Sequence, residues 1–362
     1  MAPMPSSANV RSGLPPGARV LVTGGAGFVG SHLAAELLRR GCAVHVLDDL
    51  SSGDLEHLAG LRTSPRLTVT VASAADRAVA EAACREVDAV FHLAGVVGVR
   101  LLAEQPLVVM ERNLHCTEAM LAAAQAARVP ILITSSSEVY GQGPVPFRES
   151  EPVRPGTPEG LRGGYACAKA MGEWLAMARA RQHGLRVVVA RLFNTVGPRQ
   201  SGRHGMVLPR FLAQARAGEP ITVFGDGAQT RCFAHVGEVV RALADLMAAG
   251  PWGRIVNVGS DREITVLALA ELVRAAAGGR SPIVRVPLEE VFPRGFVDPP
   301  RRVPCLQRLR QAIGWAPSMP VEAIVAELAA LPDLGLDAVD DAALAPAALA
   351  PAARGGVSLP PA

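Results

Sequence analysis

The stretch Thr23-Gly24-Gly25-Ala26-Gly27-Phe28-Val29-Gly30 decides the fold, because it connects an apolar strand expected over 19–23 to a helix with apolar residues at helical spacing. Gly24 permits a tight turn, Gly27 lets the backbone approach a pyrophosphate, and Gly30 lets the helix pack close to the sheet. The start of the helix then offers free N–H groups and a positive dipole end to an anion. The sequence therefore predicts a dinucleotide-binding turn here.

An acidic residue ends the next predicted strand, which spans 43–47. Asp48 lies 18 residues beyond Gly30, and Asp49 follows it. An acid at this position accepts hydrogen bonds from the ribose hydroxyls of NAD and repels the 2′-phosphate of NADP. We therefore expect NAD as the cofactor, with Asp48 as the ribose contact and Asp49 as the alternative.

Strands and helices alternate outward from this turn. The strands are apolar along their whole length, as expected for a parallel sheet covered on both faces. The pattern predicts an α/β fold, a doubly wound parallel sheet of the Rossmann type with a smaller C-terminal substrate lobe. Further strands are expected over 67–71, 89–93, 131–134 and 186–192, and helices over 28–38, 76–85, 106–128 and 163–182.

The same pattern predicts how the chain is divided. Residues 1–17 are expected to be a disordered lead, and 18–195 the NAD-binding domain. Residues 196–325 contain more Pro and Gly and are expected to form mainly the substrate lobe, with segments near 230–260 returning to the sheet. The Ala/Pro/Leu-rich stretch 333–362 is expected to be a disordered tail.

Composition excludes several classes of function. The net charge of the 362 residues is +3 and no dense basic run with aromatics occurs, which argues against nucleic-acid binding. We find neither a signal peptide nor an 18-residue apolar stretch, so no membrane association is expected. The six cysteines are scattered without a CxxC pair, so we expect no metal site, free thiols and a cytoplasmic location.

A tyrosine and a lysine four residues apart are the strongest chemical signal. The 36 basic residues include a single lysine, Lys169, and one of the two tyrosines is Tyr165. A bias toward arginine explains the other basic residues but not this lysine beside a rare tyrosine. On a helix the two side chains share a face. A phenol titrates near pH ~10, and a nearby cation lowers that pKa, so the pair could remove a proton from a sugar hydroxyl as hydride leaves the same carbon.

A third catalytic group is expected where the strand 131–134 ends in hydroxyls. The sequence there is Ser135-Ser136-Ser137-Glu138. We expect Ser136 to hydrogen-bond the reacting hydroxyl or keto oxygen, with Glu138 as a further catalytic residue.

Together these motifs resemble the extended short-chain dehydrogenases/reductases, in the group of nucleotide-sugar epimerases, dehydratases and decarboxylases. The resemblance covers roughly residues 18–325. Besides the glycine turn and Tyr165-x3-Lys169, it rests on His92-Leu93-Ala94-Gly95, Ser135 to Gly141, Arg191 to Arg199, and Gln229 to Phe233.

The resemblance implies roles for individual residues. It implies NAD contacts at Phe28, Val29, Leu93, Ala94 and Asn113, besides Gly24, Gly27, Gly30, Asp48 and Lys169. For a UDP-sugar substrate it implies contacts at Ser137, Asn194, Arg199, Phe224, Arg231 and Arg302, and guanidinium groups suit phosphate recognition. A homodimer through a helix bundle is also implied. One departure is Ala72-Ser73-Ala74-Ala75, where the family often has an acid that contacts adenine.

The group shares one opening step, the oxidation of the sugar at C4, and then diverges. Ser137-Glu138 lacks the Asp-Glu pair of the dehydratases, which places dehydration third. Ser137 to Gly141 and Arg231-Cys232-Phe233 resemble UDP-glucuronate decarboxylases, whereas Val96 to Arg100 resembles uronate 4-epimerases. A uronic acid would need a basic group near C6, for which Arg100, Arg199 and Arg231 are candidates.

We therefore expect a UDP-sugar 4-epimerase of the UDP-glucose or UDP-glucuronate type first, and a UDP-glucuronate decarboxylase next. A dinucleotide-binding protein without catalytic activity is the alternative from another class, although such a protein would not need the Tyr165/Lys169 pair.

Overall fold

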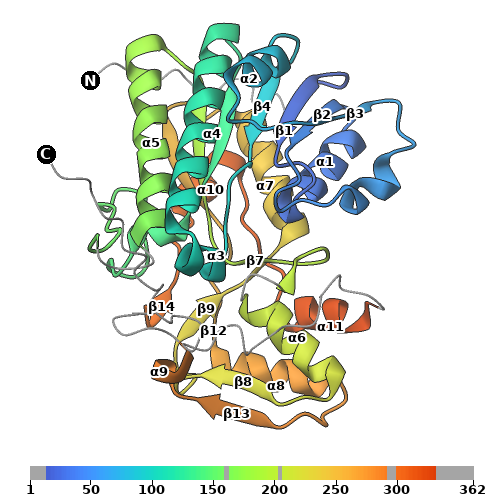
Figure 1. Ribbon diagram of the computed structural model, residues 1–362, viewed down its shortest axis with the longest axis vertical. Helices are drawn as coiled ribbons and strands as arrows, with labels where there is room; N and C mark the ends of the chain where they lie inside the picture. The colour runs from blue at the N-terminus through green and yellow to red at the C-terminus, as the bar shows by residue number, and fades with distance from the viewer. Residues whose placement is uncertain (1–13, 159–162, 203–205, 292–298, 332–362) are drawn as a thin grey trace, which may run out of the picture.

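A seven-stranded parallel sheet forms the centre of the computed structural model, which describes residues 14–158, 163–202, 206–291 and 299–331 (Figure 1). The strand order is β11-β6-β5-β4-β1-β2-β3, which confirms the predicted doubly wound fold. The strands are β1 (Arg19–Thr23), β2 (Ala43–Asp48), β3 (Leu67–Val71), β4 (Ala89–His92), β5 (Ile131–Ser136), β6 (Val187–Leu192) and β11 (Arg254–Val258).

Helices cover both faces of this sheet. Side chains of β1 show why its strands are apolar throughout, since Val20 and Val22 join one core cluster and Leu21 joins the cluster on the opposite face. One layer contains α2 (Arg77–Cys84), α4 (Pro106–Ala127) and α5 (Gly163–His183). The other contains α1 (Phe28–Arg39), α7 (Val236–Ala249) and α10 (Gln307–Ile313). Short helices η1 (Leu55–Leu61), α3 (Val99–Glu104) and η2 (Ser137–Tyr140) follow β2, β4 and β5.

A smaller lobe lies below the carboxyl ends of the strands in Figure 1. It has its own apolar core, formed by side chains such as Phe211, Leu269 and Ile324. Its elements are α6 (Val207–Ala217), β8 (Ile221–Phe224), α8 (Val266–Ala276), β13 (Ile283–Val286), α9 (Leu288–Val291) and α11 (Val321–Ala330), with β8 and β13 paired in parallel.

Two small sheets connect the lobes. β7 (Thr195–Val196) pairs in parallel with β10 (Ala234–His235) directly after β6 ends. β9 (Thr230–Cys232) lies between antiparallel β12 (Glu263–Thr265) and parallel β14 (Arg301–Arg302). These strands carry side chains from the second lobe to the edge of the main sheet.

The first described residues pack against the main domain, and some later segments of the chain return to it. Residues 14–17 belong to the expected disordered lead, yet Leu14 packs against the core and the Gly17 N–H donates to the Gly41 carbonyl at 3.0 Å. This part of the lead is ordered because it covers apolar surface beside β1. α7, β11 and also α10 lie on the main sheet. The expected tail, 333–362, lies outside the described residues.

A buried ion pair fastens α5 to β6. Arg191 donates to both carboxylate oxygens of Glu173 at 2.8 and 2.6 Å, and both side chains are almost inaccessible to solvent. The guanidinium also lies 4.6 Å from the centre of the Tyr140 ring. Because burial makes an unpaired charge costly, each partner of this pair requires the other.

Replacement of Arg191 by Met should therefore lower the apparent free energy of unfolding by about 3–5 kcal/mol, because Glu173 keeps a buried charge without its partner. Urea denaturation followed by circular dichroism measures this loss. Glu86→Gln, which breaks the exposed pair with Arg19, is the matched control and should change stability by less than about 1 kcal/mol. If the two substitutions lowered the free energy of unfolding equally, the buried Arg191–Glu173 pair would not have the stabilising role given to it here.

Candidate active site

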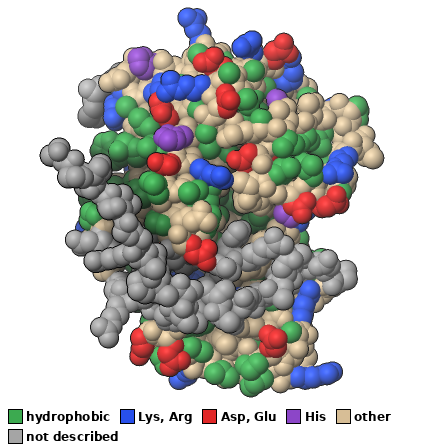
Figure 2. All heavy atoms as spheres, viewed as in Figure 1, with side chains coloured by type: hydrophobic (Ala, Val, Ile, Leu, Met, Phe, Trp, Pro, Cys, Tyr) green, Lys and Arg blue, Asp and Glu red, His purple; other side chains and the backbone are tan. Residues whose placement is uncertain are grey.

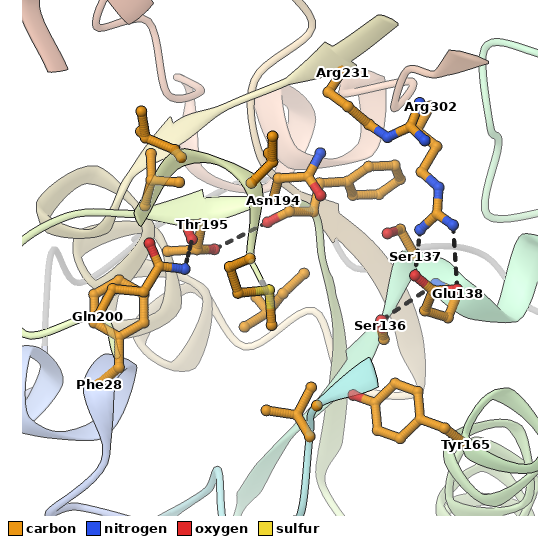
Figure 3. Close-up of a pocket in the computed structure, with 18 of the residues that line it drawn as sticks. Phe28, Ser136, Ser137, Glu138, Tyr165, Asn194, Thr195, Gln200, Arg231 and Arg302 are labelled. Atoms are coloured by element: carbon orange, nitrogen blue, oxygen red, sulfur yellow. Dashed lines mark hydrogen bonds and ion pairs between the residues drawn. The ribbon is translucent and has the colours of Figure 1, made fainter. Parts of the chain in front are cut away.

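A cavity of about 470 Å³ lies at the carboxyl ends of the sheet strands, between the two lobes. Ligands of doubly wound sheets bind at this edge. Figure 3 shows side chains from both lobes pointing into it. The residues predicted from sequence that line it are Phe28, Val29, Leu93, Ser136, Ser137, Glu138, Tyr165, Lys169, Asn194, Phe224, Arg231 and Arg302.

The glycine turn next to this cavity has no room for side chains. Gly24 has a left-handed φ of 71°, and a Cβ there would lie 2.7 Å from the Ala94 nitrogen. A Cβ on Gly30 would lie 2.0 Å from the Gly24 carbonyl oxygen. Gly27 caps α1 without a side-chain hydrogen bond, so the helix start stays open toward an anion.

Asp48 lies directly under this turn. Its carboxylate accepts hydrogen bonds from the Ala26 and Leu50 N–H groups, both at 2.9 Å. Burial raises the pKa of Asp48, and the two hydrogen bonds oppose that effect. The alternative acid, Asp49, is exposed and accepts from the Ser51 N–H at 3.0 Å. Asp48 is thus the acid that contacts the glycine turn.

Asn113 shapes the other wall of the dinucleotide region. Its amide nitrogen donates to the carbonyls of Val96 at 2.8 Å and Val109 at 2.7 Å. Within the described part of the chain its buried Oδ1 has no hydrogen-bond partner. A Cβ on Gly95 would lie 2.6 Å from this Oδ1 and 3.2 Å from the Lys169 Nζ. The open helix start, the acid and this unsatisfied acceptor together fit a dinucleotide.

Lys169 is held inside the cavity beside Tyr165. Its Nζ donates to the Thr134 carbonyl at 3.2 Å and lies 6.0 Å from the centre of the Tyr165 ring. Burial lowers the pKa of Lys169 to about 8. The amine can therefore gain or lose a proton near neutral pH.

The Tyr165 phenol meets groups with opposite effects. Burial raises the pKa of Tyr165, the Glu138 carboxylate raises it further, and a hydrogen bond with Ser136 lowers it. The Ser136 hydroxyl also accepts from the Glu138 N–H at 3.2 Å. Ser136 thus links the phenol to the first turn after β5.

Glu138 forms an ion pair with Arg302 (Figure 3). Seen from Tyr165, this pair lies beyond Ser136. The second contact of the pair, between Nη2 of Arg302 and Oε2 of Glu138, is 3.3 Å long. Arg302 on β14 is the register partner of Arg231 on β9, so the two arginines lie on neighbouring strands, and both line the cavity. Both arginine side chains are mostly buried.

The cavity also contains groups that the sequence did not indicate. Arg210, on α6, places its guanidinium carbon 3.9 Å from the centre of the Phe224 ring, and both residues line the cavity. Gln200 lines it as well, as does Gln229, the first residue of the motif Gln229 to Phe233. No sequence signal separates Arg210 from the other arginines, because only the packing of α6 on β8 brings it to Phe224.

Arg199 and Asn194, both predicted to contact the substrate, differ in their position relative to the cavity. Arg199 is not among the lining residues, and its guanidinium donates to the Ser31 hydroxyl on α1 at 3.2 Å. The amide of Asn194, which does line the cavity, donates to the Cys232 carbonyl at 3.0 Å. The side chain of Arg100 lies outside the described residues.

The residues that the structure describes include no helix long and apolar enough to cross a membrane. They also contain no cluster of three or more His, Cys, Asp or Glu residues that could hold a metal ion.

A dinucleotide turn next to a cavity that contains a Tyr-x3-Lys pair defines an enzyme of the short-chain dehydrogenase/reductase class. Residues 20–259 match the model of the NAD-dependent epimerase/dehydratase family, and the chain belongs to that family.

Relatives are found among both decarboxylases and epimerases. A UDP-N-acetyl-alpha-D-glucosaminuronate decarboxylase of Bacillus cytotoxicus is 36% identical over 302 residues, or 83% of this chain and 93% of the relative. UDP-glucuronic acid decarboxylase 1 of Danio rerio is 34% identical over 307 residues, or 84% of this chain and 70% of the relative. A solved UDP-N-acetylglucosamine 4-epimerase of Methanobrevibacter ruminantium, in complex with UDP-N-acetylmuramic acid, has a TM-score of 0.78 at 28% identity, covering 87% of this chain and 98% of its own.

The position of Glu138 leads to a prediction about the phenol. Glu138→Gln removes the negative charge that raises the pKa of Tyr165, so the phenol should ionise at lower pH. Absorbance titration of tyrosinate measures this. Since burial raises the pKa of Tyr140 to about 12, the same titration of Tyr165→Phe should be subtracted. Glu138→Asp keeps the charge and is the control. An unchanged or higher titration point in Glu138→Gln would show that the carboxylate does not act on Tyr165.

Proposed function

We propose that the protein is a UDP-hexuronate decarboxylase, which removes the C6 carboxylate of a UDP-linked uronic acid. The observation that carries the proposal is the Glu138–Arg302 ion pair, which lies beside Ser136 and Tyr165 in the cavity. It is supported by relatives of Bacillus and Danio that are named as decarboxylases of UDP-linked uronic acids.

The glycine turn, the start of α1 and Asp48 form the region to which we assign the cofactor. NAD, when bound, supplies a hydride acceptor for C4 of the sugar and returns the hydride at the end of the cycle. The α1 N-terminus and Gly27 hold its pyrophosphate, and Asp48 holds the ribose, which favours NAD over NADP. Arg199 lies against Ser31 on α1, so we assign it to the pyrophosphate rather than to the sugar.

Tyr165, Lys169 and Ser136 carry out the first proton transfer. Ser136 hydrogen-bonds the C4 hydroxyl and aligns it with the phenol, and Tyr165 accepts the hydroxyl proton as C4 is oxidised. The Lys169 amine is held by the Thr134 carbonyl. When the amine is protonated, its positive charge stabilises the Tyr165 phenolate. These roles are shared by all reactions of the family.

The step that distinguishes decarboxylation from the other reactions of the family takes place at C5 and C6 of the sugar. The C4 ketone lies β to the C6 carboxylate, so the electrons of the C5–C6 bond flow into the ketone as CO₂ leaves, and C5 then takes up a proton. The polar side chains that follow Ser136 toward this end are Ser137 and Glu138, with Arg302 opposite. Arg302 balances the negative charge of Glu138, which lets a second carboxylate, that of the substrate, enter the same space.

The rest of the substrate extends toward the second lobe. Arg231 lies beside Arg302, and both guanidinium groups can donate to a diphosphate. Phe224 lies farther along the cavity, where it offers a ring face to the nucleotide base.

A 4-epimerase, which the sequence alone favoured, is the competing function. The resemblance of residues 96–100 to uronate 4-epimerases supports it, as does the solved epimerase with a similar fold. Val96, Val97 and Gly98 of this loop line the cavity, whereas the side chains of Val99 and Arg100 lie outside the described residues. The decarboxylase relatives are more similar in sequence.

The test is to incubate the purified protein and NAD separately with UDP-glucuronate, UDP-N-acetylglucosaminuronate and UDP-glucose. We expect one uronate to yield CO₂ and a UDP-sugar one carbon shorter in equal amounts. Lys169→Met should reduce turnover by about 10²-fold or more while the fold is kept. A 4-epimer formed without CO₂ would overturn the decarboxylase proposal in favour of the epimerase.

An apolar surface on α4 and α5 supports a homodimer. Figure 2 shows hydrophobic side chains on the side of the molecule formed by these helices. Met171 and Trp174 on α5, and Leu107 and Met110 on α4, are exposed, with 61% of Trp174 accessible. The two helices pack against each other, and these four side chains stay exposed. We propose that a second copy of the chain covers this surface with the same two helices.

Trp174→Glu should then weaken the dimer, with a dissociation constant raised by roughly two orders of magnitude, because the substitution places a charge in an apolar contact. Sedimentation velocity over a range of concentrations measures the effect. Val284→Glu changes another exposed apolar side chain, in the second lobe, and should leave the mass unchanged. A wild-type protein that sediments as a monomer at all concentrations would refute the dimer.

A further inference from the structure

The two cavity arginines are carried by a very small sheet. Arg231 lies on β9, which has three residues, and Arg302 on β14, which has two. The backbone ladder between these strands is correspondingly short, with only two register pairs, Thr230 with Arg301 and Arg231 with Arg302. Few backbone hydrogen bonds therefore fix the distance between two side chains of like charge.

Glu263 on β12 joins these two strands through their side chains. The Thr230 hydroxyl donates to its Oε2 at 2.6 Å, and Nε of Arg301 donates to the same oxygen at 3.0 Å. A second nitrogen of Arg301 donates to Oε1, which makes the Arg301 contact bidentate. Thr230 and Arg301 each immediately precede one of the cavity arginines in the chain.

Because side chains alternate along a strand, the Glu263 contacts and the cavity arginines lie on opposite faces of the small sheet. Neighbouring residues of a strand point to opposite faces, so Thr230 and Arg301 share one face with Glu263 while Arg231 and Arg302 share the other. Only the arginine pair lines the cavity, and neither Glu263, Thr230 nor Arg301 does. Glu263 therefore acts on the cavity only through the strands.

We propose that Glu263 is a positioning residue that sets the spacing of Arg231 and Arg302 for the diphosphate of the substrate. The inference rests on the proposed function for the identity of that ligand. The hydrogen bond from Arg301 lowers the pKa of Glu263, so the carboxylate is ionised at neutral pH. An exposed ion pair contributes little to the stability of the whole fold, and its effect here falls on the geometry of the arginine pair.

The experiment compares Glu263→Gln and Arg301→Gln with the wild type, using UDP alone as the probe. Isothermal titration calorimetry should show the Kd for UDP raised about three- to tenfold in each variant, with KM for the uronate raised by a similar factor and kcat within about twofold of wild type. The double variant should be no weaker than the more affected single variant, because both remove the same contact. The Kd for NAD should not change, since the glycine turn lies on another element.

Glu86→Gln, which breaks the exposed pair with Arg19, is the matched control and should leave the UDP affinity unchanged. An unaltered Kd for UDP in both Glu263→Gln and Arg301→Gln would overturn the inference, as would an equal loss of NAD affinity. UDP binding is measured without turnover. A wild type that binds UDP but releases no CO₂ from either uronate therefore contradicts the proposed function, while the variants still test Glu263.

Discussion

The close approach of α1 to the glycine turn is the constraint on which the rest of the site depends. A Cβ on Gly30 would lie 2.0 Å from the Gly24 carbonyl oxygen, so any side chain at this position would push the helix off the sheet. The contact brings the start of α1 to the carboxyl end of β1. Parallel pairing then brings the ends of β4, β5 and β6 to the same edge, where Ser136, Tyr165 and Lys169 line one cavity. A few backbone contacts thus determine where the chemistry can take place.

The parts of the structure that the sequence predicted are those encoded over short distances. The glycine turn spans eight residues, Tyr165 and Lys169 are one helical turn apart, and buried parallel strands are apolar along their length. The Glu138–Arg302 pair joins residues 164 positions apart, and no periodicity or spacing connects them. The resemblance assigned Arg302 to the diphosphate, and the structure adds its contact with Glu138. Sequence therefore predicted the fold and the family better than contacts between distant segments such as this one.

The arginines also show which roles the sequence alone could not predict. Lys169 was recognisable because it is the only lysine among 36 basic residues, whereas each arginine is one of many. Packing separates them, since Arg191 is buried with Glu173, Arg210 lies over the ring of Phe224, and Arg199 contacts α1 instead of the cavity. A guanidinium group tolerates burial when its hydrogen bonds and charge are matched. Which arginines meet that condition depends on contacts between distant segments, and composition does not contain this information.

Burial also couples the two pairs of charged or titratable groups in the cavity. It lowers the pKa of Lys169 and raises that of Tyr165, so burial opposes the charged form of each group. The same low dielectric strengthens the effect of any charge placed nearby. Glu138 is such a charge, because its carboxylate opposes ionisation of the phenol, and Arg302 balances it. In the proposed reaction, the pair beside C5 and C6 therefore also affects how readily Tyr165 accepts the proton of the C4 hydroxyl. In that proposed reaction, a change at Arg302 should consequently alter the oxidation at C4 as well as the step at C5 and C6, because both depend on the charge of Glu138.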